Sequence, residues 1–179
     1  MGSSVTMKVL LEGRPGSGKS TIARRLADEL GKEGVAVSGF VTEEIRERGR
    51  RVGFSIERFG GDRGVLAHVD LPGPPRVGRY GVDLAAFERL AIPALEKAGD
   101  DDVAIIDELG KMELASEAFQ QAVSALIDRP VAVVATVQSG SHPLTDALKG
   151  RRDVETLRVT NTNRDELPDL LFERLRSAR

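Results

Sequence analysis

The sequence predicts a three-layer α/β fold, in which helices cover both faces of a mainly parallel central sheet. Short apolar runs that are typical of strands alternate with longer segments whose apolar residues recur at helical spacing. The run Val103–Ile106 is apolar without interruption, which is expected of a strand buried on both faces. A length of 179 residues with 40% hydrophobic content is enough for one sizeable core, so residues 7–179 are expected to form a single domain.

A glycine-rich loop joins the first predicted strand, Val9–Leu11, to a helix whose apolar face begins at Ile22. The loop fits the pattern G-x-x-x-x-G-K-[ST], in which backbone amides surround a polyphosphate at the positive end of the helix. We expect Lys19 to act in catalysis by contacting the β- and γ-phosphates, and the Ser20 hydroxyl to bind Mg²⁺. The sequence therefore predicts a P-loop NTPase fold, with the nucleotide bound by Gly13, Arg14, Pro15, Gly16, Ser17, Gly18, Lys19, Ser20 and Thr21.

The segment after the first helix is predicted to extend the sheet. A second strand is expected at residues 35–41. Residues 43–58 and 63–69 alternate in polarity around glycine-containing turns, which predicts an added antiparallel hairpin. Residues 71–80 are rich in proline and glycine, so we expect an irregular loop, long enough to act as a lid over a site.

The second half of the chain continues the alternation of helices and strands. Asp83 is expected to cap a helix that Pro93 kinks or interrupts. Further strands are predicted at residues 131–137 and 153–160, and an apolar stripe predicts a final helix. Asp165 is the expected N-cap of that helix, which would place the following proline in the first turn.

Several polar residues come directly after predicted strands, where ligands bind in folds of this kind. Asp107 ends the buried strand and is a candidate Mg²⁺ ligand together with Ser20. Glu108 follows it and is a candidate general base for a water in line with the γ-phosphate. Thr42 and Thr136 are further candidates at the same edge of the sheet, where Thr136 would contact the γ-phosphate or the water.

Charge that develops on the transferred phosphoryl group needs cations beyond Mg²⁺ and the loop lysine. Lys111, Arg79 and Arg164 are the candidates. A second basic cluster, Arg46, Arg48, Arg50 and Arg51, is interpreted as a solvated hairpin tip. Nucleic-acid binding there is not expected, because the chain has only six phenylalanines and one tyrosine, with no evident stacking pair.

Composition argues against several classes of protein. The formal charge of −2 gives no global attraction to nucleic acid or to an acidic membrane surface. The absence of cysteine excludes disulfides and thiolate metal sites. No apolar run has the length of a membrane span, so a cytoplasmic monomer is expected. Residues 1–6 are interpreted as a disordered leader or a remnant of cloning.

Beyond the phosphate loop, the sequence resembles the small thermostable nucleoside-triphosphatase family, which includes the human cancer-related nucleoside triphosphatase. The matching stretches are Gly39–Glu44, Gly53–Phe54, Val77–Asp83, Phe87, Leu90–Leu95, Ile106–Leu114 and Asn163–Asp165. The resemblance implies a Mg²⁺-dependent enzyme that hydrolyses ATP, GTP and other nucleoside triphosphates slowly and with loose base preference. It also implies the class of P-loop fold that has an additional strand between the loop strand and the magnesium strand.

Two other functions compete with hydrolysis on sequence grounds. A P-loop kinase would use the same loop to transfer the γ-phosphoryl group to a nucleotide, a small molecule or a polynucleotide end. A guanine-nucleotide switch is suggested by Asp107–Gly110, which fits D-x-x-G, but Asn161–Asp165 does not supply the N-K-x-D motif that reads guanine.

Overall fold

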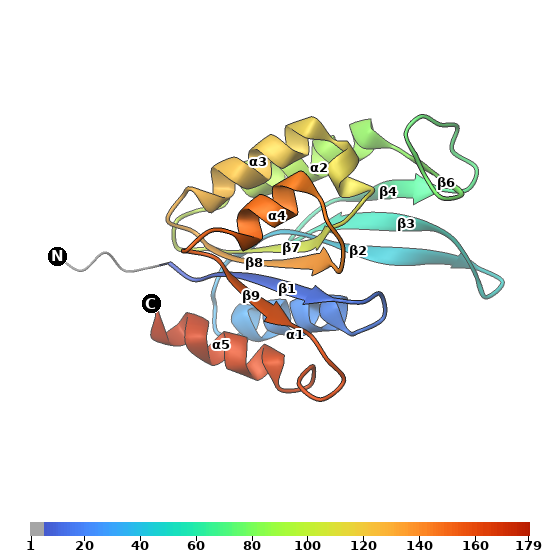
Figure 1. Cartoon of the computed structure of the whole chain (residues 1–179). Helices are drawn as coiled ribbons and strands as arrows, with labels where there is room; N and C mark the ends of the chain where they lie inside the picture. Colours follow the sequence, from blue (N-terminus) through green and yellow to red (C-terminus); the bar gives the residue numbers. More distant parts are fainter. Residues whose placement is uncertain (1–5) are drawn as a thin grey trace.

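The computed structural model describes residues 6–179, in which a nine-stranded mixed sheet carries helices on both faces (Figure 1). Of the expected leader, residues 1–6, only Thr6 lies within the described residues. The order of the strands across the sheet is β5-β6-β4-β3-β2-β7-β8-β1-β9. Their bounds are β1 (Lys8–Gly13), β2 (Val37–Glu47), β3 (Arg50–Arg58), β4 (Arg63–His68), β5 (Arg76–Val77), β6 (Tyr80–Val82), β7 (Val103–Leu109), β8 (Ala132–Gln138) and β9 (Glu155–Arg158).

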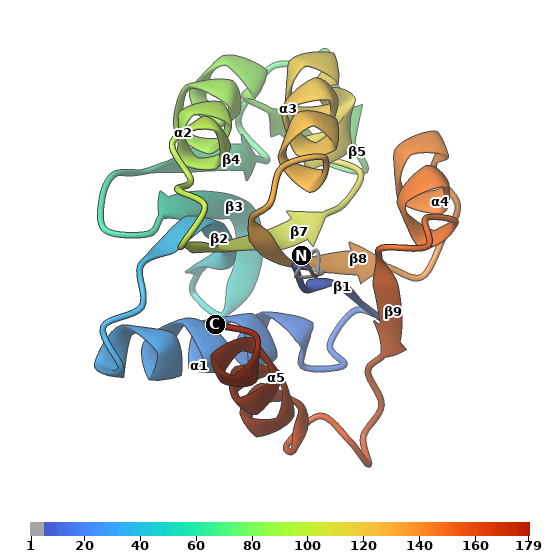
Figure 2. The same ribbon diagram turned by 90° about the vertical axis from the view of Figure 1, so that its left-hand side faces the viewer.

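The helices form two layers, with α1 and α5 on one face of the sheet and α2, α3 and α4 on the other (Figure 2). None of the helices between residues 6 and 179 is both long and apolar enough for a membrane crossing. Their bounds are α1 (Lys19–Lys32), α2 (Leu84–Glu96), the 3₁₀ helix η1 (Glu113–Ala115), α3 (Glu117–Ile127), α4 (Pro143–Lys149) and α5 (Leu167–Ser177).

The parallel half of the sheet runs β2-β7-β8-β1-β9. The expected strand at 103–108 is β7, and its first five residues are all buried because helices cover both faces. β8 lies between β1 and β7, so one strand separates the loop strand from the strand that carries Asp107. The predicted fold class, including the additional strand, is confirmed.

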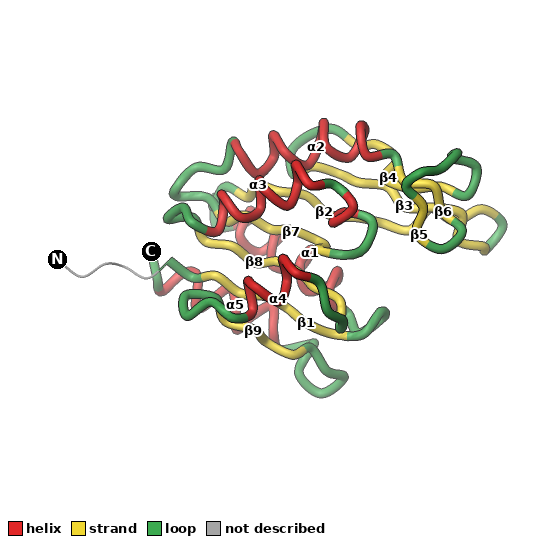
Figure 3. The backbone as a smooth tube through the Cα atoms, turned by 45° about the horizontal axis from the view of Figure 1, so that its top comes forward, coloured by secondary structure: helices red, strands yellow, loops and turns green. Residues whose placement is uncertain are grey.

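The antiparallel half of the sheet consists of β3, β4, β6 and β5 (Figure 3). The hairpin prediction is confirmed, although β2 is one long strand that pairs with β7 at its start and with β3 beyond (Figure 1). The prediction that residues 71–80 lack regular structure is wrong, because Arg76–Val77 pairs with Tyr80–Val82 in a short hairpin around Gly78. Gly78 has φ +57°, which lets the chain turn back from β5 into β6.

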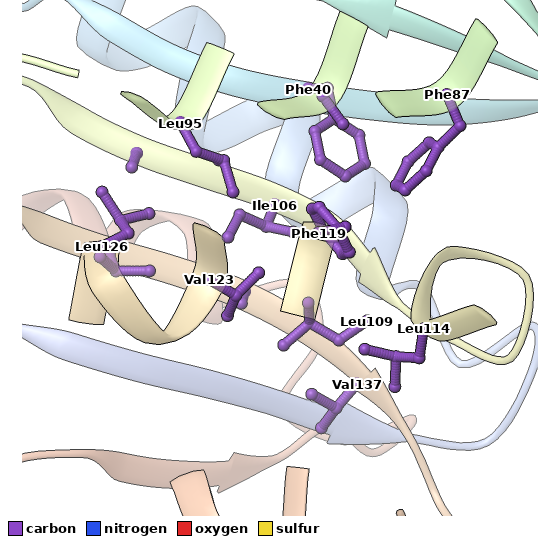
Figure 4. Packing of buried hydrophobic residues seen from close by; sticks show 14 of the residues in the cluster. Phe40, Phe87, Leu95, Ile106, Leu109, Leu114, Phe119, Val123, Leu126 and Val137 are labelled. Atoms are coloured by element: carbon purple, nitrogen blue, oxygen red, sulfur yellow. The ribbon is translucent and has the colours of Figure 1, made fainter. Parts of the chain in front are cut away.

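The larger core lies between the sheet and the layer of α2, α3 and α4, and three phenylalanines form its centre (Figure 4). The ring centroids of Phe87 and Phe119 are 4.8 Å apart, and those of Phe40 and Phe87 are 5.7 Å apart in an edge-to-face arrangement. Such pairs add roughly 0.5–1.5 kcal/mol each beyond the burial of their area. The second core lies under α1 and α5 and holds the helix of the phosphate loop against β1.

Two helix-end predictions have different outcomes. Asp83 caps α2 as predicted, because its Oδ1 accepts a hydrogen bond of 2.9 Å from the Ala86 amide. The predicted interruption at Pro93 does not occur, because α2 continues to Glu96. Its buried face, which includes Phe87, packs against the core on both sides of the proline. The prediction that Asp165 caps the last helix is wrong, since α5 begins at Leu167 without any side-chain cap.

Candidate active site

The loop between β1 and α1 has the backbone geometry of a phosphate-binding loop. Gly16 and Gly18 have φ values of +77° and +100°, which a side chain would strain. A Cβ on Gly13 would lie 2.5 Å from Ser17 Oγ, so only glycine lets the loop fold back on itself. α1 begins directly afterwards at Lys19, and the first-turn amides of a helix have no partners within the helix, so they are available to a ligand in the loop.

Lys19 is held inside this loop. Its Nζ donates to the Gly13 carbonyl at 2.7 Å and to the Arg14 carbonyl at 3.1 Å, and the residue is only 6% exposed. The ammonium group therefore lies inside the loop, where it can contact a ligand that the loop binds.

The carboxylate of Asp107, on β7, connects this strand to helix α1 and to β8. Its Oδ1 accepts hydrogen bonds from Ser20 Oγ at 3.0 Å and from Thr136 Oγ1 at 2.7 Å. Burial raises the pKa of Asp107, and the two hydroxyl donors offset part of this effect. Its Oδ2 is buried without a hydrogen-bond partner among residues 6–179, as expected of an oxygen that awaits a cation.

These oxygens fit a hard divalent cation. Carboxylate and hydroxyl oxygens are the ligands that Mg²⁺ prefers, and it normally takes one or two carboxylates and completes its shell with phosphate oxygens and water. Within the described part of the chain, no cluster of three or more His, Cys, Asp or Glu residues has metal-binding geometry. The candidate site at Asp107 and Ser20 is therefore incomplete without a substrate phosphate.

Glu108 lies next to Asp107 on the rim, half-buried in a cavity of about 620 Å³ that the phosphate loop also lines. Gln138 Nε2 donates to Glu108 Oε1 at 2.7 Å and fixes the orientation of the carboxylate. Burial raises the pKa of Glu108, and the neighbouring Asp107 charge raises it further. A carboxylate with a raised pKa is a stronger base, which suits proton abstraction from water.

Glu113 is a third carboxyl group at this site, and sequence reasoning gave it no role. The residue is 4% exposed at the start of η1, and burial together with the Glu108 charge raises the pKa of Glu113 to about 8. A Cβ on Gly110 would lie 2.9 Å from Glu113 Oε2 and 3.0 Å from Glu108 Oε1, so the two carboxyl groups meet over this glycine. The sequence feature that could have indicated this contact is Gly110, which stands between Glu108 and Glu113.

The candidate threonines and Lys111 lie at the predicted edge of the sheet, but only Thr42 and Lys111 reach the cavity. Thr42, at the point where β2 leaves the parallel half, and Lys111, in the loop after β7, both line the 620 Å³ cavity. Thr136 lies underneath, fully buried, where its hydroxyl contacts Asp107 rather than the cavity.

The two candidate arginines have different positions. Arg164 lies beside the phosphate loop, with its Cδ 3.4 Å from where a Cβ on Gly18 would be. It lines a smaller cavity of about 250 Å³ that adjoins the loop. Arg79 lines neither cavity, because its guanidinium lies over the ring of Tyr80 at 5.2 Å and donates to the Arg51 carbonyl. Its predicted role at the phosphates is not supported by this position.

Arg51 was assigned to the solvated hairpin tip, but the structure places it in the wall of the 620 Å³ cavity. Its Nη1 donates to Glu44 Oε1 at 2.9 Å and its Nε to Tyr80 Oη at 3.0 Å. The sequence did not reveal this position, because Tyr80 reaches Arg51 only through the pairing of β6 with β4 and β4 with β3.

The fold and this site together define a P-loop NTPase of the additional-strand class. A protein-family model described as NTPase matches residues 8–172. The chain belongs to this NTPase family, as the resemblance predicted.

Similar proteins cover nearly the whole chain. The nucleoside-triphosphatase THEP1 of Thermotoga sp. (strain RQ2) is 43% identical over 162 residues, which are 90% of this chain and 91% of that protein. The cancer-related nucleoside-triphosphatase of Homo sapiens is 41% identical over 182 residues, which cover 91% of this chain and 94% of the human protein.

Two solved structures share the fold. The crystal structure of THEP1 from the hyperthermophile Aquifex aeolicus superposes with a TM-score of 0.86 at 36% identity, covering 94% of this chain and 99% of that one. The solution structure of a human cancer-related nucleoside triphosphatase gives a TM-score of 0.85 at 39% identity, covering 97% of this chain and 100% of that one.

Proposed function

We propose that this chain hydrolyses nucleoside 5′-triphosphates to the diphosphate and inorganic phosphate. The observation that carries the proposal is the convergence of two elements at one cavity: α1 brings Lys19 and Ser20, and β7 brings Glu108 to the cavity and Asp107 to the Ser20 hydroxyl. Relatives whose names state this activity are 41–43% identical over most of the chain.

The phosphate loop binds the triphosphate in a defined direction. Backbone amides of such a loop take the α- and β-phosphates, and its lysine takes the β- and γ-phosphates. Lys19 therefore exchanges its hydrogen bonds with loop carbonyls for phosphate oxygens, which are stronger, charge-assisted acceptors. The γ-phosphate then lies at the end of the site that Glu108 occupies.

The oxygens of Asp107 and Ser20 would hold a divalent cation, which we propose is Mg²⁺. When bound, this ion supplies positive charge to the β- and γ-phosphate oxygens. The Thr136 hydroxyl keeps Oδ1 of Asp107 in a fixed direction, which leaves Oδ2 available to the ion.

Glu108 acts as the general base. Gln138 occupies its Oε1, so Oε2 is available to accept a proton from a water beside the γ-phosphate. Lys19 and Lys111 are the cations that balance the charge of the transferred group, because both line the cavity at this end.

We expect little discrimination between bases. The smaller cavity beside Gly18 and Thr21 is lined by Arg164, whose planar guanidinium can stack on any base without reading its edge. Purine and pyrimidine triphosphates should therefore bind with similar affinity.

The test is phosphate release from ATP, GTP, CTP and UTP with Mg²⁺ and without any acceptor, on the wild type and on Glu108→Gln. We expect release from all four and a loss of roughly 10²–10⁴-fold in the variant at unchanged nucleotide affinity. Gln121→Glu, an exposed change on α3, is the matched control and should keep the wild-type rate. Tight binding without release would contradict hydrolysis, and an unchanged rate in Glu108→Gln would assign the base to another group.

A further inference from the structure

The triphosphate does not account for the whole of the 620 Å³ cavity. This cavity meets the smaller one at Gly18 and Thr21, on the α-phosphate side, where the nucleoside leaves the loop beside Arg164. The γ-phosphate lies at the opposite end, next to Glu108. Beyond Glu108, hydrolysis needs space only for one water, which fills about 30 Å³ in the liquid.

The lining of the same cavity nevertheless includes residues far along the chain from the phosphate loop, and we call the part that they line the distal chamber. It is built by the antiparallel half of the sheet, by the outer part of β2 and by the loop after β7, none of which forms the phosphate loop. Figure 1 shows β2 and β3 extending beyond the carboxyl ends of the parallel strands, so that they form a wall above the rim. The residues of the distal chamber are Glu44, Arg51, Phe54, Val77, Tyr80 and Met112.

The walls of the distal chamber are shaped by fixed side chains. The rings of Phe54 and Tyr80 lie 5.3 Å apart at 73°, and the Arg51 guanidinium lies 5.2 Å from the Phe54 centroid. Glu44 and the Tyr80 hydroxyl hold two nitrogens of that guanidinium, while its Nη2 donates to no residue between 6 and 179. A half-buried thioether, Met112, adds a polarisable surface. This combination suits a flat ring that accepts a hydrogen bond at its edge.

The charges around the distal chamber select a neutral ligand. Glu44 and Glu108 repel an anion, while Arg51 and Lys111 repel a cation. A ligand that lies along the aromatic wall would have its other end at Glu108, where a hydroxyl can donate a hydrogen bond to the carboxylate.

We propose that the distal chamber binds a second ligand, an uncharged heteroaromatic alcohol such as a nucleoside, together with the triphosphate. Its ring lies against Phe54 and Met112, its edge accepts a hydrogen bond from Arg51, and its hydroxyl takes the position of the hydrolytic water at Glu108. This inference rests on the proposed function, because the direction of the bound triphosphate is taken from it.

Met112 provides a direct probe of binding. The chain has three methionines, so protein labelled with ¹³C-methyl methionine gives few signals, and Met112→Leu assigns the one from the chamber. The protein is first saturated with Mg²⁺ and an ATP analogue that has a nitrogen in place of the β,γ-bridging oxygen. Adenosine, guanosine, cytidine and uridine are then titrated in turn. We expect at least one of them to shift the Met112 signal to saturation while the analogue remains bound.

Two arginines on β3 give a matched pair of variants. Arg51→Ala removes the donor in the chamber and should weaken nucleoside binding roughly 10-fold or more, the effect of one charge-assisted hydrogen bond. Arg50→Ala changes an exposed neighbour outside the chamber and should alter affinity by about two-fold at most. Both residues are at the surface, so the folded state is expected to persist.

Three outcomes would overturn the proposal: no saturable shift with any nucleoside, a shift that the analogue abolishes by competition, or equal affinity in Arg51→Ala and Arg50→Ala. The titration needs no turnover, so absence of hydrolysis leaves it interpretable. Failure of the analogue to bind would instead contradict the proposed function.

Discussion

The parallel and antiparallel halves of the sheet differ in how their residues reach the cavity. In the parallel half, the helix that follows β1 begins with Lys19, and β7 carries Asp107 and Glu108 near its end, so two local segments bring these residues to one edge of the sheet. In the antiparallel half, Arg51 and Tyr80 meet only through two strand pairings, β3 with β4 and β4 with β6. The comparison teaches that the catalytic end is specified by local motifs and the distal chamber by long-range pairing.

The largest expected effect comes from the parallel half, in Lys19→Ala. This change removes the ammonium that the loop carbonyls hold, and we expect it to abolish triphosphate binding or turnover. Lys32→Ala, at the exposed end of the same helix, is the control and should leave both intact. Isothermal titration with the imido analogue and a phosphate-release assay measure the two quantities. Wild-type activity in Lys19→Ala would remove the phosphate-loop assignment.

Gly110→Ala tests the point where the carboxyl groups of Glu108 and Glu113 meet, in the loop after β7. The new Cβ would crowd the carboxyl groups of Glu113 and Glu108, and displacing the base by about 1 Å can lower the hydrolysis rate roughly 10²-fold. Gly140→Ala adds the same methyl group where nothing lies within 4 Å and should not change the rate. If the two variants hydrolyse ATP equally fast in a phosphate-release assay, close packing over Gly110 does not position the base.

The raised pKa of Glu113 predicts that the free energy of unfolding depends on pH. Its pKa is about 8 in the folded state against 4.5 for a free carboxyl, so between these values the folded state holds a proton that the unfolded state has lost. The free energy of unfolding should therefore fall as pH rises through this window, by up to a few kcal/mol. Urea unfolding at several pH values measures this, and Glu113→Gln should flatten the slope. A slope unchanged in Glu113→Gln would show that the carboxyl group is not held neutral by burial.

The smallest effect compares two helix caps. Asp83→Ala removes the hydrogen bond to the Ala86 amide and should lower the free energy of unfolding by about 1 kcal/mol. Asp165→Ala removes an exposed side chain that caps no helix, and its effect should stay within about 0.5 kcal/mol. Urea denaturation measures both, and an equal loss in the two variants would contradict the assignment of the α5 terminus.

Much of the fold and the catalytic end of the site could be predicted because their signals are local. The loop pattern around Lys19 and the buried run that ends at Asp107 are each contained in one segment, and the geometry of parallel strands brings their ends to one edge. The fold class, the additional strand and the hairpin all followed from such signals together with the family resemblance. The roles of the individual site residues remain predictions for the assays above.

The remaining features required the tertiary structure. The proline-rich segment 71–80 contains strand β5 because β6 offers it a pairing partner, which no local pattern encodes. Arg51 and Arg79 are the same residue type, and each stands in a polar stretch of the sequence, yet only Arg51 lines the cavity. Glu113 has a raised pKa because the surrounding fold excludes water from it. Apart from the short hairpin within residues 71–82, the sequence alone determined which segments form strands, helices and the phosphate loop, because backbone preference is local. Only packing decided which side chains share the cavity and how burial alters their chemistry.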